Sequence, residues 1–414
     1  MKIVIYNIGC KVNQCECDSL ASTLRKSGHT VVNELEAADS YIINTCAVTQ
    51  EAEKKSRQCV ARVKKYNPDA DIYVIGCASE KNMEQFTLKG VKYVAGTAHK
   101  ELVATLCESN AKHDLPTKYE NLDYGQTERA RSFVKVQDGC NNFCSYCIVP
   151  YLRGRSRSRE LGDIIVECNM RSLDTDEIVL AGINLSAYGK DIGLNLTDLV
   201  KATANISARI RLGSLEINAI TVNLLQAVKD SGNICPHFHL SLQSGDDGVL
   251  KSMNRHYTRE EFIKKVKKIR KFFPESAITT DIIVGFPTED EEAFEATLDF
   301  VKQVGFSDIH IFPYSRRAGT AAFPLGALND EVVKTRIERL AALRDTLKRE
   351  YLTMFIEREL DVIAEYADDR FIEGYSENYI RVYIPHNSTA QLGKLYKVRA
   401  DNLHKDGLIA RKKY

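Results

Sequence analysis

Three cysteines stand in one short run, Cys140-Asn-Asn-Phe-Cys144-Ser-Tyr-Cys147. This spacing lets a single loop offer three thiolates to one metal cluster. Structural zinc sites use four ligands, often in two cysteine pairs, and a bacterial ferredoxin run adds a fourth cysteine before proline. The next cysteine here is Cys168, beyond a basic stretch. The pattern predicts an iron-sulfur cluster with one iron open to a small molecule; a zinc knuckle with a distant fourth ligand is the minor alternative.

A second set of cysteines is spread along the first part of the chain. Cys10, Cys46 and Cys77 each follow an apolar run, in the contexts NIGCKVNQ, INTCAVTQ and VIGCASE. Apolar and amphipathic runs alternate over residues 1–107, which predicts βαβ units on an open parallel sheet. Because parallel strands end at a common edge, where such folds bind ligands, these cysteines are expected to meet. They predict a second three-thiolate metal site, and three separate buried thiols are the alternative.

The elements that would position the run at 140–147 begin at Phe133. Six apolar runs alternate with helical stretches there: FVKVQ, EIVLAGIN, RIRLGSLE, HFHLSLQSG, AITTDIIVGFP and DIHIFPYS. This predicts a barrel-like α/β domain whose functional loops follow the strands, and the cysteine run directly follows the first strand.

The remaining segments set the domain limits. The polar stretch 108–128 has no sustained period and predicts a linker. After a long helical stretch, short strands and turns extend to Tyr414 and predict a small five-stranded β-barrel. The fold class is therefore α/β with a terminal β-barrel, divided into domains at 1–107, 129–350 and 351–414.

Composition narrows the class of protein further. The chain has 414 residues, 44% of them hydrophobic, which is enough for several packed domains. No apolar run approaches the length of a membrane span, and the opening residues lack the features of a secretion signal. We therefore expect a cytoplasmic protein without a membrane partner. In that reducing compartment, twelve cysteines favour metal or redox chemistry over disulfides.

The charge pattern leaves the partner open. A net charge of +1 gives no overall attraction to nucleic acid. Basic residues from Arg129 to Arg159 nevertheless form a patch around the cysteine run. In the terminal barrel, acidic residues dominate the first part of the sequence and a basic patch follows near its end. RNA would explain both patches. An anionic cofactor or the cluster thiolates would equally explain the first, and a solvated tail the second.

The segments GCKVNQ, NTCAVT and VIGCASE, followed by DGCNNFCSYCIVPYLRGRSRSR, together resemble the methylthiotransferases, a family of radical S-adenosylmethionine enzymes. The resemblance covers nearly the whole chain. It implies an amino-terminal cluster domain, a central radical S-adenosylmethionine partial (β/α) barrel and a carboxyl-terminal TRAM-like barrel that binds RNA. These enzymes insert sulfur into an unactivated C–H bond and methylate it.

The resemblance also implies two 4Fe-4S clusters. The cluster on Cys140, Cys144 and Cys147 would reduce S-adenosylmethionine to yield a 5′-deoxyadenosyl radical, which takes the substrate hydrogen. The cluster on Cys10, Cys46 and Cys77 would hold the sulfur donor, and another S-adenosylmethionine would methylate that sulfur. A low-potential electron donor such as flavodoxin or ferredoxin is implied as a partner.

Further site residues come from motifs that match the family's barrel. The implied cofactor contacts are Asn184, Tyr188, Glu216, Gln243 and Arg255; each could instead satisfy neighbouring backbone at the barrel mouth. Arg153 and Arg155 are expected either to face substrate phosphate or to brace the cluster loop. The other cysteines are expected to be bystanders or to pack as small hydrophobic residues: Cys15, Cys17, Cys59, Cys107, Cys168 and Cys235.

The substrate prediction depends on a few residues. GCKVNQ with NTCAVTQEAEKKSRQ resembles the branch of the family that acts on threonylcarbamoyladenosine beside the tRNA anticodon. A GCQMN-like opening would favour the isopentenyladenosine branch, and a GCxKN-like opening the branch that modifies a ribosomal protein. The alternative from another class is a non-enzymatic iron-sulfur protein that binds RNA or transfers electrons, which would not cleave S-adenosylmethionine.

Overall fold

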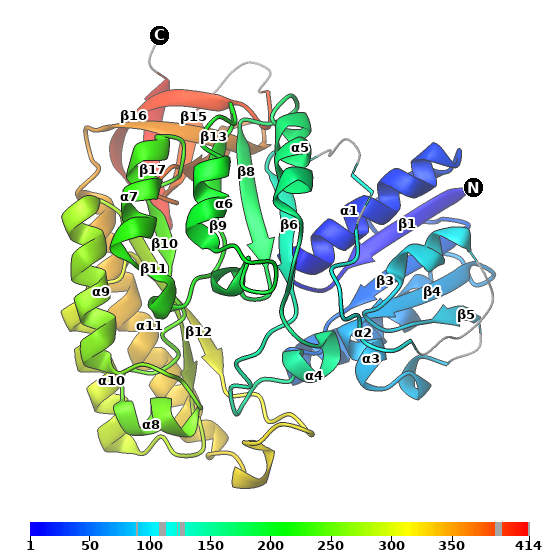
Figure 1. The fold of residues 1–414 in the computed structure, drawn as a ribbon, viewed down its shortest axis with the longest axis horizontal. Helices are drawn as coiled ribbons and strands as arrows, with labels where there is room; N and C mark the ends of the chain where they lie inside the picture. Colours follow the sequence, from blue (N-terminus) through cyan, green and yellow to red (C-terminus); the bar gives the residue numbers. More distant parts are fainter. Residues whose placement is uncertain (88–89, 107–112, 122, 125–128, 386–390, 413–414) are drawn as a thin grey trace.

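The computed structural model describes residues 1–87, 90–106, 113–121, 123–124, 129–385 and 391–412. Cys107 and much of the predicted linker 108–128 lie outside these ranges. Figure 1 shows three parts in chain order: an amino-terminal sheet domain, a central α/β domain and a carboxyl-terminal barrel. Within the described ranges, no helix has both the length and the apolar character needed to cross a membrane.

The amino-terminal domain is the open parallel sheet predicted from the sequence. Its strand order is β2-β1-β3-β4-β5, with every neighbouring pair parallel. The strands are β1 (Lys2–Asn7), β2 (Thr30–Val32), β3 (Ser40–Thr45), β4 (Asp71–Gly76) and β5 (Val91–Val94). The helical segments are α1 (Lys11–Lys26), α2 (Gln50–Val63), α3 (Cys77–Lys81), η1 (Glu84–Phe86) and η2 (Lys100–Thr105). The short strand β2 was not predicted.

Burial explains the apolar runs of this sheet. All residues of β3 are buried, as expected for a central parallel strand that is covered on both faces. One apolar core lies on each face of the sheet. The first core also takes in Ile148 and Leu152, which come from the central domain, so the two domains share a core at this point.

The central domain contains all six predicted strands and the additional short strand β7. They form two sheets, β7-β6-β8-β9 and β10-β11-β12, joined by isolated bridges between Ile210 and Ile234 and between Leu215 and Leu240. The partial barrel therefore ends at β12, an edge strand. The strands are β6 (Ser132–Asp138), β7 (Arg157–Ser158), β8 (Glu177–Gly182), β9 (Arg209–Leu212), β10 (His237–His239), β11 (Ala277–Val284) and β12 (Asp308–Pro313).

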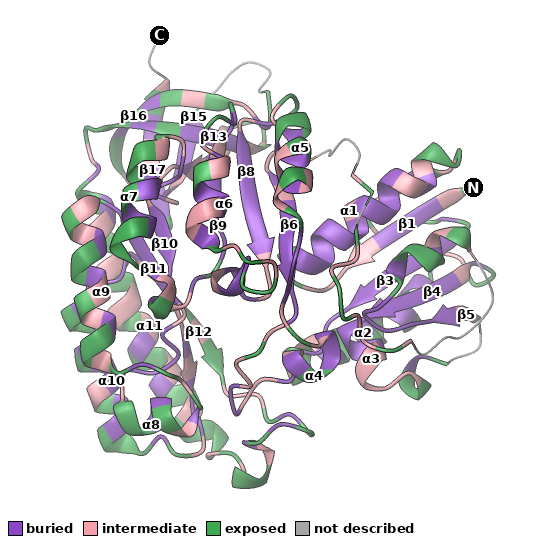
Figure 2. Cartoon of the chain, viewed as in Figure 1, coloured by how far each residue is buried: buried purple, intermediate pink, exposed green. Residues whose placement is uncertain are grey.

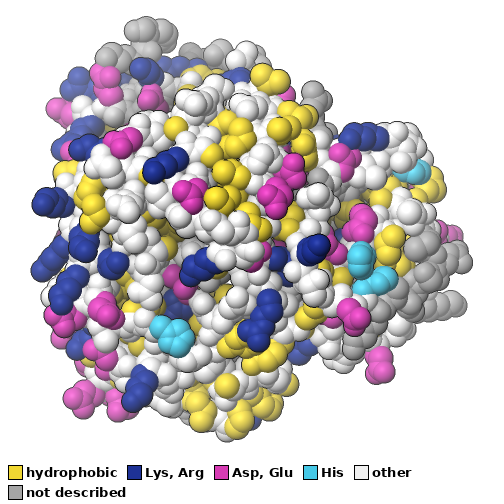
Figure 3. Space-filling view, in the orientation of Figure 1, with side chains coloured by type: hydrophobic (Ala, Val, Ile, Leu, Met, Phe, Trp, Pro, Cys, Tyr) yellow, Lys and Arg dark blue, Asp and Glu magenta, His cyan; other side chains and the backbone are white. Residues whose placement is uncertain are grey.

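Helices cover the outside of this partial barrel. In Figure 2 the outward sides of α9 and α10 are exposed while their inward sides are buried. Figure 3 shows Lys and Arg side chains mixed with Asp and Glu on this side of the molecule, as expected for a solvated helix face. The helical segments are α4 (Val149–Arg153), α5 (Leu161–Arg171), η3 (Leu185–Ala187), α6 (Leu196–Ala202), η4 (Ile217–Ala219), α7 (Val222–Ser231), α8 (Asp247–Ser252), α9 (Arg259–Phe272), α10 (Glu291–Val304), η5 (Phe323–Leu325) and α11 (Asp330–Thr353).

The carboxyl-terminal part is a closed five-stranded barrel, as predicted. Its order is β13-β14-β15-β17-β16, which encloses its own apolar core. The strands are β13 (Glu359–Ala367), β14 (Phe371–Ser376), β15 (Arg381–Pro385), β16 (Leu395–His404) and β17 (Gly407–Lys412). Arg209 and Arg211 of β9 fix this barrel to the central domain by donating to carbonyl oxygens of Asp361, Tyr375, Ser376 and Glu377.

Candidate active site between two cysteine sets

The first cysteine set consists of Cys10, Cys46 and Cys77, which lie at one edge of the amino-terminal sheet. Their strands β1, β3 and β4 are neighbours, and Thr45 pairs with Gly76 at the ends of β3 and β4. Cys10 is the N-cap of α1, Cys46 follows β3 directly, and Cys77 begins α3. Gly76 has φ +110°, and a Cβ there would lie 2.6 Å from the carbonyl oxygen of Thr45, so this turn requires glycine.

A buried ionic cluster lies behind the first set. The guanidinium of Arg153 donates to Glu16 at 2.9 Å, to Asn13 at 3.0 Å, to Asp138 at 3.1 Å and to the Sγ of Cys77 at 3.4 Å. Burial alone would raise the pKa of Glu16, but Arg153 and neighbouring lysines hold it well below its usual range. A buried charge network of this kind is stable only when every member is paired.

The second cysteine set, Cys140, Cys144 and Cys147, lies on the loop between β6 and α4. The Cys140 N–H donates to the carbonyl of Gly154 at 3.1 Å, and the Cys147 N–H donates to that of Cys144 at 2.9 Å. Gly139 has φ +68°, and a Cβ there would overlap the carbonyl oxygen of Arg155. The loop is thus held tightly enough to fix the spacing of its thiols.

Four of the five predicted cofactor contacts lie around the second set. Asn184 Nδ2 is 3.7 Å from the Sγ of Cys140, and the buried Asn184 Oδ1 has no partner among the described residues. Arg255 donates to the Sγ of Cys144 at 3.2 Å and pairs with Glu216 at 3.1 Å. Asn184 and Glu216 line a cavity of about 300 Å³. Gln243 lines a different cavity, described below as the aromatic cavity, which Cys147 also lines.

For Tyr188 and Arg153 the contacts favour the alternative that was given beside the cofactor or substrate role. Tyr188 is fully buried and donates its hydroxyl to the carbonyl of Arg159 at 3.1 Å, so its side chain packs in the barrel core instead of facing a cofactor. Arg153 is also fully buried, and its guanidinium donors are used within the protein, which favours bracing over contact with substrate phosphate. Arg155 is exposed and stacks on Phe143 at 4.6 Å, where it is accessible to a phosphate.

Both sets adjoin the same interdomain space. A cavity of about 240 Å³, here called the aromatic cavity, is lined by Val48 and Thr49, which follow Cys46, and by Cys147 itself. Its other walls include Tyr146, Phe312 and Tyr314. A second cavity of about 330 Å³, here called the histidine cavity, is lined by Cys10 and Lys11. Asp281 lines both cavities and is a wall common to them.

The thiols fit iron-sulfur ligation. Burial, together with the neighbouring thiols of each set, raises the pKa of Cys46 to about 11 and that of Cys147 to about 12. Thiolates are the donors that iron-sulfur clusters use, and each set supplies three. Ligation would deprotonate them, and the nearby cations Arg153 and Arg255 favour thiolates. The residues present therefore fit one cluster per set.

Sequence reasoning missed a polar group in the histidine cavity. His239 Nε2 is 3.1 Å from Asp281, and His310 Nδ1 is 3.2 Å from the other oxygen of this carboxylate. These side chains come from β10, β11 and β12. The alternation of HFH, TTD and DIHI was the available signal, because it points polar residues of adjacent strands to the same side.

Comparison with known proteins agrees with this architecture. Residues 134–301 match the radical SAM superfamily, and residues 2–96 match the uncharacterized protein family UPF0004. A solved structure of the radical S-adenosylmethionine methyltransferase TsrM from Kitasatospora setae has TM-score 0.57 at 12% identity, with 78% of this chain and 77% of that chain covered. This likeness concerns the fold alone. Fold and cysteine geometry together define a radical S-adenosylmethionine enzyme.

Full-length relatives narrow the class. The threonylcarbamoyladenosine tRNA methylthiotransferase MtaB of Bacillus subtilis is 36% identical, with 96% of this chain and 93% of the relative covered. MtaB of Thermotoga maritima is also 36% identical, with 99% of this chain and 97% of the relative covered. The tRNA-2-methylthio-N(6)-dimethylallyladenosine synthase of Thermodesulfovibrio yellowstonii is 32% identical, with 98% of this chain and 97% of the relative covered. The chain belongs to the radical S-adenosylmethionine methylthiotransferases, and within them it is of the MtaB type.

Proposed function

We propose that this enzyme converts threonylcarbamoyladenosine beside the tRNA anticodon to its 2-methylthio derivative. The proposal includes two 4Fe-4S clusters, one on each cysteine set, and S-adenosylmethionine. It also includes a low-potential donor such as flavodoxin or ferredoxin, and the cytoplasm as the compartment where this tRNA is found. The MtaB relatives support the substrate.

One observation carries the proposal. The residues after Cys46 and the side chain of Cys147 line the same aromatic cavity, although the two cysteines belong to different domains. A sulfur held at the first set and a radical generated at the second set must reach the same carbon atom. A shared cavity between the sets meets that requirement.

The chain's own residues would position the reactants. When bound, the clusters and S-adenosylmethionine supply the radical and methyl-transfer chemistry. Asn184 and Glu216 offer amide and carboxylate groups to a polar cofactor in the cavity beside Cys140. Tyr146, Phe312 and Tyr314 give the aromatic cavity walls on which a purine can stack and from which water is excluded.

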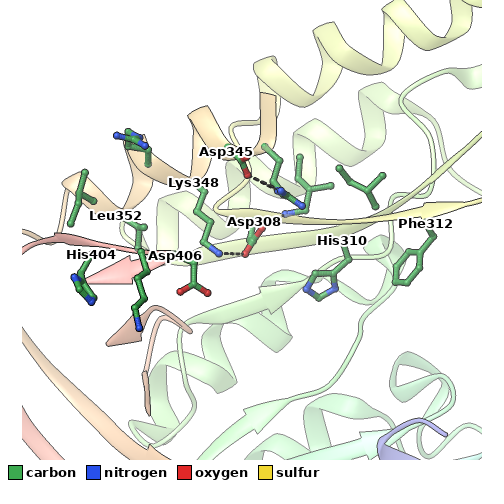
Figure 4. Close-up of a pocket in the computed structure, with 14 residues that line it drawn as sticks. Asp308, His310, Phe312, Asp345, Lys348, Leu352, His404 and Asp406 are labelled. Atoms are coloured by element: carbon green, nitrogen blue, oxygen red, sulfur yellow. Dashed lines mark hydrogen bonds and ion pairs between the residues drawn. The ribbon is translucent and has the colours of Figure 1, made fainter. Parts of the chain in front are cut away.

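Strand β12 offers a route for the RNA. A groove of about 800 Å³ lies between β12, α11 and the turn that joins β16 to β17 (Figure 4). Arg344, Lys348, Arg349 and Lys405 line it, and Lys348 pairs with Asp308 at 2.8 Å. Phe312 lines both this groove and the aromatic cavity. A phosphate backbone bound by the groove's cations would thus reach the site along β12.

The testing experiment is mass spectrometry of tRNA nucleosides from cells with and without the gene. Loss of 2-methylthio-threonylcarbamoyladenosine with accumulation of its precursor supports the proposal. An unchanged level, with loss of the isopentenyladenosine product or of a ribosomal-protein modification, would assign the enzyme to another branch. Intact modification in every class would overturn the enzymatic proposal in favour of an iron-sulfur RNA-binding protein.

A further inference from the structure

The histidine cavity has a polar lining that the two cysteine sets do not explain. Its walls come from the start of α1, from the inner sides of β9, β10 and β11, and from Tyr379 of the carboxyl-terminal barrel. Tyr379 stacks on His237 at 4.6 Å with the rings nearly parallel. The cavity is therefore built by all three domains, and its lining includes Cys10 and His310.

The charges in this cavity favour an anion. Asp281, its carboxylate, already accepts from both His239 and His310. Arg211 is balanced by the buried Glu177, at 2.8 Å. Lys11 is exposed and has no ion pair among the described residues, so its ammonium is the cation of this lining that is left to bind a ligand. A helix start without a side-chain cap lies at the same place, because the N-cap of α1 is Cys10.

Hydrogen-bond geometry defines the remaining polar positions. His237 Nε2 and His239 Nδ1 both lie 2.9 Å from the hydroxyl of Thr279. This hydroxyl has one proton, so it donates to one ring and accepts from the other. His239 Nε2 donates to Asp281, and if His239 is neutral its Nδ1 accepts from Thr279. His237 then donates through Nε2, and its Nδ1, which is buried and unpartnered among the described residues, is left as an acceptor.

We infer that the histidine cavity binds the N6 substituent of the substrate adenosine, with Lys11 and His310 contacting its carboxylate. The inference rests on the proposed function and names the determinant of its specificity. A threonylcarbamoyl group carries a carboxylate that can reach the Lys11 ammonium and the His310 ring, and it carries a hydroxyl and urea N–H groups for an acceptor such as His237 Nδ1. The purine would lie in the adjoining aromatic cavity, which Asp281 separates from the substituent.

Two other ligands fit the lining less well. A divalent cation could be held by His239, Asp281 and His310, whose donor atoms lie within 4.8 Å of one another, but the Lys11 ammonium in the same cavity repels a cation. An apolar dimethylallyl group would cover the Lys11 ammonium and the Nδ1 of His237 without offering either a partner, which is costly. The lining thus discriminates by what it leaves unpaired when the wrong substituent enters.

The test compares two substituents in two proteins. The reconstituted holoenzyme is titrated, at fixed salt, with an anticodon stem-loop carrying threonylcarbamoyladenosine and with the same stem-loop as its carboxyl methyl ester. The proteins are wild type, K11M and the control K267M, which removes an exposed lysine from the outer helix α9. We expect wild type and K267M to bind the acid about tenfold more tightly than the ester, the usual value of one charged hydrogen bond. K11M should lose most of this preference and keep only the part that His310 supplies.

Retention of the full acid preference by K11M, or no preference in wild type, overturns the inference and assigns Lys11 to balancing the cluster charge. Iron per chain is measured in each protein. If K11M loses iron, H310Q on β12 replaces it, and a reduced acid preference in H310Q supports the inference whereas an unchanged preference overturns it. Failure of wild type to methylthiolate the acid stem-loop would overturn the proposed function alone, because the binding preference is measured separately.

Discussion

The two cysteine sets are positioned by different routes. Cys140, Cys144 and Cys147 belong to one loop, which backbone hydrogen bonds hold to Gly154 and Met253 of the same central domain. Cys10, Cys46 and Cys77 come from the ends of three strands, so the register of a parallel sheet and the ionic cluster around Arg153 position the first set. The first set therefore depends on the interface between two domains, whereas the contacts described for the second set lie within one domain. The domain interface should matter to one set and hardly to the other.

The largest effect is expected from removing each set in turn. Replacing Cys10, Cys46 and Cys77 together by Ala should abolish methylthiolation and leave reductive cleavage of S-adenosylmethionine close to the wild-type rate. Replacing the second set should abolish both. Chromatography of 5′-deoxyadenosine and of the modified nucleoside measures the two reactions. C59A, which removes a buried cysteine of α2 outside both sets, is the control. Equal loss of cleavage in both triple variants would end the division of labour.

The next test breaks the support of the first set. R153M removes one of the two cations that pair with both buried carboxylates, Glu16 and Asp138, and leaves Lys135 as the other, so we expect the free energy of unfolding to fall by up to about 3–5 kcal/mol. Iron bound by the first set should fall with it, because Arg153 also contacts Cys77. Urea titration and iron analysis in proteins that retain a single set measure these effects.

R155M is the matched control for R153M. It removes an exposed arginine from the same motif, and we expect the free energy of unfolding to fall by less than about 0.5 kcal/mol. Equal stability losses in the two variants, or equal iron loss from both sets in R153M, would show that the ionic cluster does not single out the first set.

The same contrast explains what the sequence could predict. The parallel sheet, the partial barrel and the terminal barrel follow from apolar periodicity, and the fold class was confirmed. The pairing of Glu16 with Arg153 was not predictable, because the partners are 137 residues apart and charged residues are ordinarily expected at the surface. Arg153 was therefore assigned to substrate as one of two readings, and Tyr188 to the cofactor. The ligand roles of both cysteine sets stay predictions.

Acid should also act on a second buried ionic site, which lies around Glu177 and away from both cysteine sets. Glu177 lies on β8 between Arg209 and Arg211; burial alone would raise its pKa, but the arginines lower it to about 2. Since the folded-state pKa lies below the unfolded value, its contribution is complete above about pH 5 and is lost as pH falls through about 4 toward 2. That shift corresponds to about 3 kcal/mol.

E177Q should remove this part of the pH dependence and loosen the carboxyl-terminal barrel, whose carbonyls Arg209 and Arg211 also contact. Urea midpoints of the apoprotein between pH 6 and 3 measure the pH dependence of the stability. E292Q, on the exposed start of α10, is the control. A pH profile of E177Q parallel to that of wild type would contradict the assignment.

The smallest effect concerns the cofactor side of the second set. Asn184 lies beside Cys140, and its buried Oδ1 lacks a partner among the described residues, so a polar cofactor in the adjoining cavity would supply one. N184A should weaken S-adenosylmethionine binding about fivefold, the value of about 1 kcal/mol for one hydrogen bond, without changing iron per chain. Anaerobic calorimetry measures the affinity, with N205A at an exposed position as the control. Since backbone hydrogen bonds to Gly154 and Met253 also hold the loop of the second set, its cluster should tolerate this change; iron loss from N184A would mean that the Asn184 side chain is needed to hold the cluster.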